Sequence, residues 1–553
     1  FDGSDLKQIT FGDSYKTRGV ADYIAQEEMG RANGFWWSLD SKFVAFSEVD
    51  NSQIPAFKIS HLADNNHQDE IHYYPFVGSE NPIVKIGIVN TDSLECNWID
   101  TSGYEYIPRL NWVKSNQILV QLQNREQTKL DVNLYNNSGE LLGTIIKEKS
   151  DFWINIHEAF QNLSDGKYVW TSEKTGFRHL YGLDLISREL NQITTGDWQI
   201  DSFEGFSKDT NELFFTATKD SELEKHLYRI NKEGVIDPIS LNRPGIHNVK
   251  INCDQNIYID VNHALSQQPR VELRNLKTDE LIKDISPDKD VRIEQFGLTP
   301  PKLLKIPHEK SEYLNSAVFY PDENEYGPGP YPTVVYVYGG PHVQLVTDSW
   351  GLTANLRLQY LRDQGFLVTV VDNHGSNRRG VSFESSIKNK LGEIEVNDQK
   401  LMLDWLIDQG LTDEKRVGVF GWSYGGYMTL MCMAKYPELF RVGAAGAPVV
   451  NWQLYDTHYT ERYLGLLEDN YENYDLSNVT TYAKNLDGEL MIIHGMIDEN
   501  VHFTHSAELI QSLIENDKSY DLLAFPKERH MPRGHSDRVY MEKRMMDFLI
   551  SKI

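Results

Sequence analysis

One short segment combines a serine with closely spaced glycines. Residues 421–427 read Gly-Trp-Ser-Tyr-Gly-Gly-Tyr, after the apolar run 416–420 and before the apolar helical pattern 428–434. A strand, a Gly-x-Ser-x-Gly turn and a helix form a nucleophile elbow, in which the backbone crowds the positions two before and two after the serine. The strained turn exposes the Ser423 hydroxyl to a base and a substrate carbonyl. A packing turn is the alternative, and the flanking strand and helix favour a serine hydrolase.

Such an elbow predicts an acid later in the chain. Asp498 follows the apolar run 490–493, just beyond the end of an expected buried strand, where α/β sheets build their active sites. Glu499 is the neighbouring rival, and we prefer Asp498. A simple cap for the helix expected near residue 503 is the alternative role for this aspartate.

A histidine should follow the acid. His530 lies in a loop between the run 521–525 and the last helical pattern, and His535, the rival, starts that helix. The ordinary pKa of histidine lets His530 accept the Ser423 proton and return it to the leaving amine. Asp498 would hold the tautomer of His530 and stabilise the imidazolium.

The oxyanion of the reaction needs hydrogen-bond donors. One is the backbone N–H of Tyr424, the residue after the nucleophile. The second should come from the loop after an early strand, residues 338–341, where the Tyr338 hydroxyl is available.

The first half of the chain, residues 1–298, predicts an all-β domain. Short aromatic and β-branched segments alternate with polar turns and repeat loosely, as in 35–46, 110–121, 205–216 and 250–260. About five such units predict a β-propeller. They resemble the C-terminal blades of a larger ring, so we expect the propeller to be incomplete and its N-terminal blades to lie outside this chain.

The second half, residues 299–553, predicts a doubly wound, mostly parallel sheet with helices. Continuous apolar runs indicate buried strands at 331–338, 366–372, 416–420, 442–445, 490–493 and 521–525. Helical patterns lie between or after them at 396–409, 506–514 and 538–550. With the elbow, this alternation predicts an α/β-hydrolase domain.

Composition narrows the function. The 553 residues include 54 basic and 81 acidic ones, a net charge of -27, which argues against nucleic-acid binding. No apolar run reaches the length of a membrane span, and no signal segment is present. Three cysteines give neither a disulfide framework nor a zinc spacing, so the compartment stays open between periplasm and cytoplasm. Histidines cluster at 67–72, where a metal site is a weaker interpretation than a solvated loop. We expect no metal and no cofactor.

Together the motifs resemble the prolyl oligopeptidase family and, within it, the dipeptidyl peptidase IV subfamily in its bacterial type. Besides the elbow, the matching segments are 26–31, 34–37, 391–399, 455–465 and 494–503. The resemblance implies a serine exopeptidase that releases N-terminal Xaa-Pro, and less well Xaa-Ala, dipeptides through an acyl-enzyme.

The resemblance also implies site residues. Glu27 and Glu28 match the paired glutamates that hold the free N-terminus of the substrate, and two carboxylates can bracket one ammonium. Without the resemblance, a Glu-Glu pair would be a solvated surface. The residues that match the substrate pocket are Tyr424, Val449, Trp452, Tyr455, Tyr459 and Val501, with Asn500 for the P2 carbonyl. An aromatic stretch such as 452–463 is otherwise more often core.

Two departures from the family pattern stand out. His374 occupies a position where relatives commonly carry arginine. The chain also lacks the region that supplies an arginine for the P2 carbonyl. The implied partners are peptides with a free N-terminus and a second copy of the chain in a homodimer.

Alternative functions remain open. An oligopeptidase or acylaminoacyl peptidase of the same family needs no glutamate pair. A carboxylesterase would have no obvious use for a propeller. From a different class, an inactive propeller and hydrolase scaffold is opposed by the presence of Ser423, Asp498 and His530.

Overall fold

A computed structural model describes residues 8–13, 15–63, 69–158, 160–164, 166–287 and 291–553. Internal contacts divide the chain into two compact units. The first unit comprises Phe1–Phe160, Leu183–Leu190 and Trp452–Tyr474. The second comprises Gln161–Gly182, Asn191–Asn451 and Asp475–Ile553. The boundary between residues 298 and 299 therefore stays a prediction.

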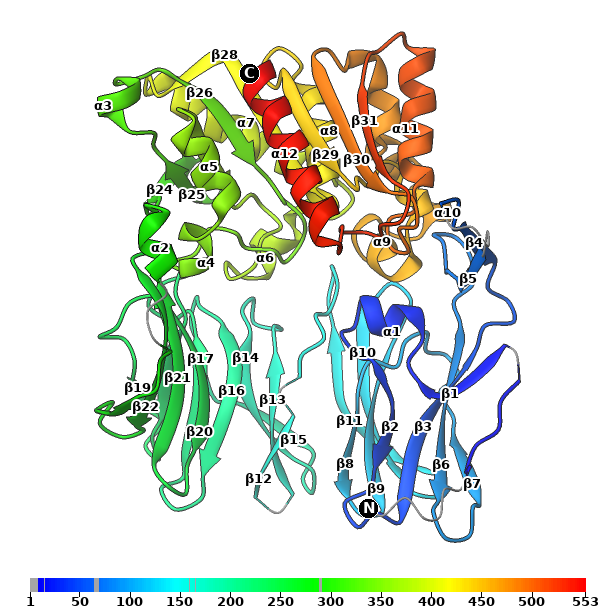
Figure 1. Ribbon diagram of the computed structural model, residues 1–553. Coiled ribbons are helices and arrows are strands. Elements are labelled where there is room, and N and C mark those ends of the chain that lie inside the picture. Colours follow the sequence, from blue (N-terminus) through cyan, green and yellow to red (C-terminus); the bar gives the residue numbers. More distant parts are fainter. Residues whose placement is uncertain (1–7, 14, 64–68, 159, 165, 288–290) are drawn as a thin grey trace. The chain divides into compact units, whose positions relative to one another are not determined.

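Strands dominate the chain before residue 285 (Figure 1). They are β1 (Lys16–Val20), β2 (Asn33–Trp37), β3 (Phe43–Asp50), β4 (Ala56–Ser60), β5 (Asp69–Tyr73), β6 (Ile83–Asn90), β7 (Cys96–Ile99), β8 (Leu110–Lys114), β9 (Gln117–Gln123), β10 (Lys129–Asn136), β11 (Leu141–Lys149), β12 (Gln161–Ser164), β13 (Lys167–Ser172), β14 (His179–Asp184), β15 (Glu189–Gln192), β16 (Ile200–Ser207), β17 (Glu212–Ala217), β18 (His226–Ile230), β19 (Ile236–Pro238), β20 (Ile246–Asn252), β21 (Ile257–Ala264), β22 (Gln267–Asn275) and β23 (Leu281–Asp284).

Most of these strands form sheets of four or five. The orders are β1-β2-β3-β6-β7, β11-β10-β9-β8, β12-β13-β14-β15, β16-β17-β18-β19 and β20-β21-β22-β23, and β4 pairs with β5. Four-stranded sheets that follow one another along the chain are the building units of a β-propeller.

The loose repeats of the sequence are β-hairpins. Residues 205–216 span the turn between β16 and β17, and 250–260 span the turn between β20 and β21. Each turn places an asparagine in the left-handed region, Asn211 at φ 57° and Asn256 at φ 54°. Asparagine adopts this conformation more readily than most residues because its short polar side chain hydrogen-bonds locally. The polar turn that marks these two repeats thus has a conformational cause.

An eight-stranded sheet lies within the second unit, in the order β24-β25-β27-β26-β28-β29-β30-β31. Its strands are β24 (Lys302–His308), β25 (Glu312–Phe319), β26 (Tyr331–Tyr336), β27 (Leu367–Val371), β28 (Thr412–Trp422), β29 (Val442–Gly446), β30 (Glu489–Gly495) and β31 (Asp521–Phe525). The strands from β26 onward pair in parallel, and β24 and β25 add an antiparallel edge. All six strands predicted from apolar runs are confirmed.

Helices cover both faces of this sheet. The helices of the chain are α1 (Tyr23–Glu27), α2 (Val291–Gln295), α3 (Glu323–Tyr326), α4 (Trp350–Thr353), α5 (Leu356–Asp363), α6 (Val381–Glu384), α7 (Ile394–Asp408), α8 (Tyr424–Lys435), α9 (Thr457–Leu464), α10 (Leu467–Leu476), α11 (Thr504–Glu515) and α12 (His535–Lys552), with 3₁₀ turns η1 (Ser385–Ile387), η2 (Trp452–Leu454) and η3 (Val479–Asn485). In Figure 1, α5 and α12 lie on one face, and α7, α8 and α11 lie on the other. Doubly wound α/β domains have this layering.

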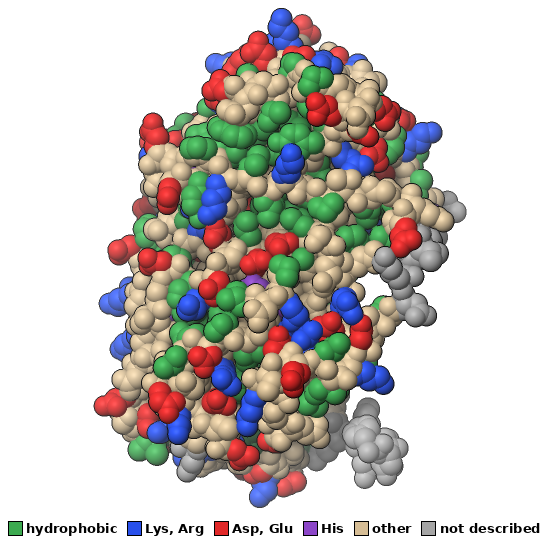
Figure 2. Space-filling model, turned by 90° about the vertical axis from the view of Figure 1, so that its left-hand side faces the viewer, with side chains coloured by type: hydrophobic (Ala, Val, Ile, Leu, Met, Phe, Trp, Pro, Cys, Tyr) green, Lys and Arg blue, Asp and Glu red, His purple; other side chains and the backbone are tan. Residues whose placement is uncertain are grey.

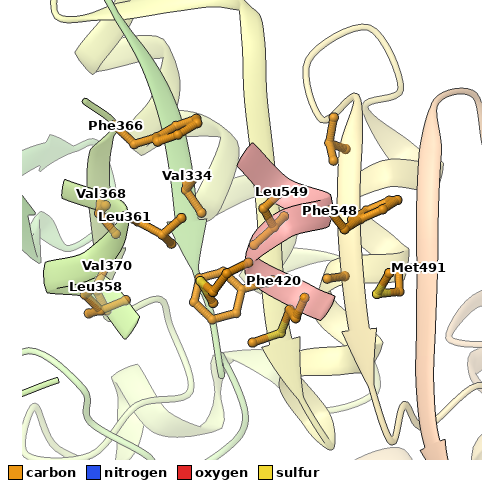
Figure 3. Close-up of a cluster of buried hydrophobic side chains, with 14 of the residues drawn as sticks. Val334, Leu358, Leu361, Phe366, Val368, Val370, Phe420, Met491, Phe548 and Leu549 are labelled. Atoms are coloured by element: carbon orange, nitrogen blue, oxygen red, sulfur yellow. The ribbon is translucent and has the colours of Figure 1, made fainter. Parts of the chain in front are cut away.

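Helix α12 packs on the sheet through buried apolar side chains. Figure 3 shows Phe548 and Leu549 of α12 beside Phe420 of β28, with Met491 of β30 close to Phe548. Parallel strands that are buried on both faces read as continuous apolar runs, which is why the sequence predicted them. This packing fixes the carboxyl ends of β28 and β30, from which the candidate site is built.

Charged side chains of both signs are mixed over the face shown in Figure 2, with apolar patches between them. On this face the acidic excess of the sequence is therefore dispersed. Within the described residues, no helix combines the length and the apolar character that a membrane crossing requires.

Candidate active site

Ser423 sits at the turn between β28 and α8. Its φ of 61° and ψ of -117° lie in a region that residues with a side chain rarely adopt, as in a strained nucleophile elbow. A Cβ at Gly421 would stand 2.3 Å from the Val337 carbonyl oxygen, and a Cβ at Gly425 would meet the same oxygen at 2.3 Å. Only glycine fits at these two positions, so the sequence motif has a steric cause.

Asp498 and His530 meet beyond the ends of β30 and β31. The Nδ1 of His530 lies 2.8 Å from Asp498 Oδ2. The other oxygen, Oδ1, accepts the backbone N–H groups of Asn500 and Val501, each at 2.9 Å. Because the carboxylate accepts from Nδ1–H, the Nε2 of His530 keeps its lone pair and is able to take a proton.

The electrostatics favour an ionised Asp498. Its side chain is only 1% exposed. This burial would raise the pKa of Asp498, but hydrogen bonds from His494 and His530 outweigh it and hold the pKa well below its usual range. Trp422, the residue before the serine, donates its indole N–H to the His530 carbonyl at 2.8 Å. The histidine loop is therefore attached to the elbow itself.

Tyr424 and Tyr338 lie together beside the elbow. Their ring centroids are 6.1 Å apart. A Cβ at Gly340 would come within 2.7 Å of the Tyr338 ring and 2.9 Å of the Tyr424 ring, so glycine allows this approach. The backbone N–H of Tyr424 belongs to the first turn of α8, where N–H groups lack partners within the helix and can bind an anion.

A buried carboxyl supports Tyr424. The Tyr424 hydroxyl donates to Glu395 Oε1 at 2.7 Å, and the backbone N–H of Gly392 donates to the same carboxyl. Glu395 is 0% exposed, and burial raises its pKa to about 7 although both hydrogen bonds act in the opposite direction. Sequence reasoning missed Glu395, since a pairing across 29 residues is a tertiary contact.

In the first unit, a second carboxyl group joins the predicted glutamate pair. Glu28 ends α1, and Asp456 precedes α9, whose Tyr459 N–H it caps at 2.9 Å. Burial raises the pKa of both carboxyls, that of Asp456 to about 7, and repulsion from Asp456 adds to the rise at Glu28. Glu27, the other member of the pair, is exposed. Asp456 lies in the matching segment 455–465, but the sequence analysis assigned it no role.

Three of the predicted pocket residues pack on one another in the first unit. Trp452 stacks on Tyr459 with ring centroids 5.8 Å apart, and Tyr455 meets both rings edge-on. Helix α9 carries Tyr459 of this group and is anchored by Glu461, which is bound through both oxygens to Arg125 at 2.7 Å. The rings therefore have a fixed geometry.

The remaining predicted pocket residues belong to the second unit. Val449 and Val501 are buried, and Asn500 is half-buried beside Asp498. Their grouping with the three aromatic side chains into one pocket stays a prediction.

His374, at the position where the resemblance implies arginine, lies in a cluster with His308 and Asp398. The three offer ligand atoms within 4.8 Å of one another, a group that could hold a metal ion. However, His308 Nδ1 accepts the backbone N–H groups of Lys310 and Ser311. A metal on Nε2 would require a hydrogen on Nδ1, facing those donors. We interpret the cluster as two histidines that share a carboxylate. Of the histidine-rich segment 67–72, residues 67 and 68 lie outside the described residues.

Comparisons with known proteins agree with this fold. Residues 2–269 match the N-terminal region of dipeptidyl peptidase IV, and residues 352–553 match the prolyl oligopeptidase family. Dipeptidyl peptidase 8 of Homo sapiens is 29% identical, over 97% of this chain and 69% of its own length. Prolyl endopeptidase FAP of Homo sapiens is 27% identical, over 96% and 74%. The crystal structure of dipeptidyl peptidase 4 from Porphyromonas gingivalis superposes with a TM-score of 0.91 at 25% identity, covering 98% of this chain and 77% of that one.

The fold and these matches define a serine hydrolase in which a propeller region precedes an α/β-hydrolase domain. The chain belongs to the prolyl oligopeptidase family, as a serine peptidase of the dipeptidyl peptidase IV type.

Proposed function

We propose that the protein is an exopeptidase that releases Xaa-Pro, and less well Xaa-Ala, dipeptides from the free N-terminus of peptides. The observation that carries the proposal is the Asp498–His530 pair, attached through Trp422 to the strained Ser423. A hydroxyl next to a base that is itself oriented by a carboxylate is the arrangement for acyl transfer.

In the proposed reaction His530 Nε2 accepts the Ser423 proton as the hydroxyl oxygen attacks the scissile carbonyl. The backbone N–H of Tyr424 and the hydroxyl of Tyr338 stabilise the oxyanion. His530 then gives the proton to the leaving amine, which departs as the shortened peptide. Water, activated by the same histidine, hydrolyses the acyl-enzyme and frees the dipeptide.

The carboxyls of Glu27, Glu28 and Asp456 would bind the substrate ammonium group. In the unbound protein, burial and the neighbouring carboxyls raise the pKa of Glu28 and of Asp456, which favours their protonated forms. An entering ammonium supplies the missing positive charge, so the carboxyls ionise and form charge-assisted hydrogen bonds. Binding of the ammonium group by this anchor would select the second peptide bond of the substrate for cleavage.

The S1 pocket would be formed by Tyr424, Val449, Trp452, Tyr455, Tyr459 and Val501, with Asn500 on the P2 carbonyl. Small apolar side chains and rigid rings suit a pyrrolidine ring. The homodimer implied by the resemblance is part of the proposal, and light scattering on the purified protein tests it.

The test compares Gly-Pro-p-nitroanilide with its N-acetylated form. Cleavage of the free-amine substrate alone is expected. Equal cleavage of both would contradict the ammonium anchor and indicate an endopeptidase or acyl-peptidase. One relative, prolyl endopeptidase FAP, is named as an endopeptidase. Absence of any hydrolysis, with Ser423 unreactive to a fluorophosphonate, would indicate an inactive scaffold.

A further inference from the structure

His494 is a buried histidine of the second unit that the proposed reaction does not use. It lies near the end of β30, four residues before Asp498, and its side chain is 0% exposed. The ring of Phe503 packs against it with centroids 5.4 Å apart. A polar ring in such a place needs hydrogen-bond partners, and those partners define its role.

The hydrogen bonds of His494 fix its tautomer. Its Nε2 lies 2.8 Å from the Val501 carbonyl oxygen, which can only accept, so Nε2 carries a hydrogen. Its Nδ1 lies 2.7 Å from the Ser506 hydroxyl. That hydroxyl can donate to the bare Nδ1 of a neutral ring. Both nitrogens are thus engaged, and the ring cannot turn without losing a partner.

The same Nε2–H also faces Asp498. The distance from His494 Nε2 to Asp498 Oδ2 is 3.2 Å, and this is the oxygen that His530 Nδ1 approaches at 2.8 Å. Oδ2 therefore accepts from two imidazoles, while Oδ1 accepts from the backbone N–H groups of Asn500 and Val501. Four donors surround one carboxylate, and His494 is the one donor of the four that belongs neither to the carboxylate loop nor to the proposed proton relay.

We propose that His494 is a positioning residue for the reaction, whose shared Nε2–H disperses the negative charge that Asp498 Oδ2 presents to His530. The proposal rests on the proposed roles of Asp498 and His530. Since the same N–H binds the Val501 carbonyl, His494 also joins the carboxylate to the loop that carries a predicted pocket residue.

A consequence for the protonation of His530 follows. A carboxylate with fewer donors keeps more of its negative charge on Oδ2 and stabilises the imidazolium of His530 more strongly. Loss of the His494 donor should therefore raise the pKa of His530 and reduce the fraction of free base at neutral pH. Among the other charged groups of these loops, Glu499 lies 3.4 Å from Arg529 and 3.8 Å from Arg533. Glu528 accepts the backbone N–H groups of Arg533 and Gly534.

The test is the pH profile of kcat/KM for Gly-Pro-p-nitroanilide from about pH 5 to about pH 9, where a histidine titrates. His494→Leu removes the donor at similar volume, and His494→Gln keeps an N–H near the position of Nε2. His494→Phe is a second variant without a donor, in case the leucine variant does not fold. Rates are expressed per active site, counted with a fluorophosphonate.

In the leucine and phenylalanine variants, the acid limb of the kcat/KM profile should shift to higher pH by about one unit, as expected for the loss of one hydrogen bond to a charged group. The glutamine variant should keep the limb of the native enzyme. A uniform loss of activity with an unmoved limb, or a downward shift, would show that His494 only supports the fold and would overturn the proposal. Absence of hydrolysis and of fluorophosphonate labelling in the native enzyme would overturn the proposed function itself.

Discussion

Replacing Asp498 by asparagine should disable the site while keeping its shape. The backbone N–H groups of Asn500 and Val501 face Oδ1 at 2.9 Å, and they can only donate. The amide oxygen of the new side chain must therefore face them, which turns its NH₂ group toward the Nδ1 of His530 and the Nε2 of His494. Donor then faces donor at the position that orients His530.

The expected loss of activity follows from this clash. His530 relieves it by moving its hydrogen from Nδ1 to Nε2, the nitrogen that must accept the Ser423 proton, and the anion that stabilises the imidazolium is also gone. We expect kcat for Gly-Pro-p-nitroanilide to fall by roughly 10³–10⁴-fold, with a residual rate from binding and the oxyanion donors. This fall corresponds to about 4–5 kcal/mol in the activation barrier.

A neighbouring substitution is the control. Glu499→Gln makes the same change of carboxylate to amide one residue further along, where the side chain faces Arg529 and Arg533. Because this pair is partly exposed, we expect kcat within about threefold of the native value. Circular dichroism confirms the folding of both variants. The reasoning is refuted if Asp498→Asn keeps more than about a tenth of kcat, or if Glu499→Gln is equally damaging.

Three further predictions concern the anchor and the elbow. Glu28→Gln should lower kcat/KM for the free-amine substrate by about 100-fold, and a similar loss on any substrate that is cleaved in N-acetylated form would contradict the anchor. The pKa of Asp456 is raised to about 7 in the folded chain, whereas the unfolded chain releases this proton near pH 4. The contribution of Asp456 to the free energy of unfolding therefore declines as the pH rises from about 4 to about 7. Asp456→Asn should therefore raise the melting temperature more at pH 8 than at pH 5, and differential scanning fluorimetry giving equal shifts would refute this. Gly421→Ala should abolish activity and lower the melting temperature because its Cβ would stand 2.3 Å from the Val337 oxygen, whereas Gly351→Ala, with its nearest contact at 4.0 Å, should be tolerated.

The sequence predicted the parts of the fold that have a strong pattern. Strands buried on both faces, such as β27 and β29, are continuous apolar runs and were found. The antiparallel β24 and β25 were missed. In β24 every residue except Ile306 is exposed or half-buried, and the strand carries Lys302 and Lys305, so it forms no continuous apolar run. The four quoted repeats were found because each contains a polar turn between two strands.

The candidate site shows the same division. Ser423, Asp498 and His530 were predicted because the elbow and the chain order constrain residue types. Asp456 and Glu395 were not, because a buried carboxyl is recognised by its partner rather than by its neighbours in sequence. Asp456 begins a helix, so a helix cap was the only role that its local pattern could suggest.

The most direct test of the central claim is mass-spectrometric mapping of the protein after reaction with Gly-Pro diphenyl phosphonate, a dipeptide probe with a free amine that reacts with an activated serine. The account predicts a single adduct, on the peptide containing Ser423, that forms more slowly with the N-acetylated probe. Its formation should fall in Asp498→Asn. An adduct on a different serine, or labelling that does not depend on the free amine, would contradict the account.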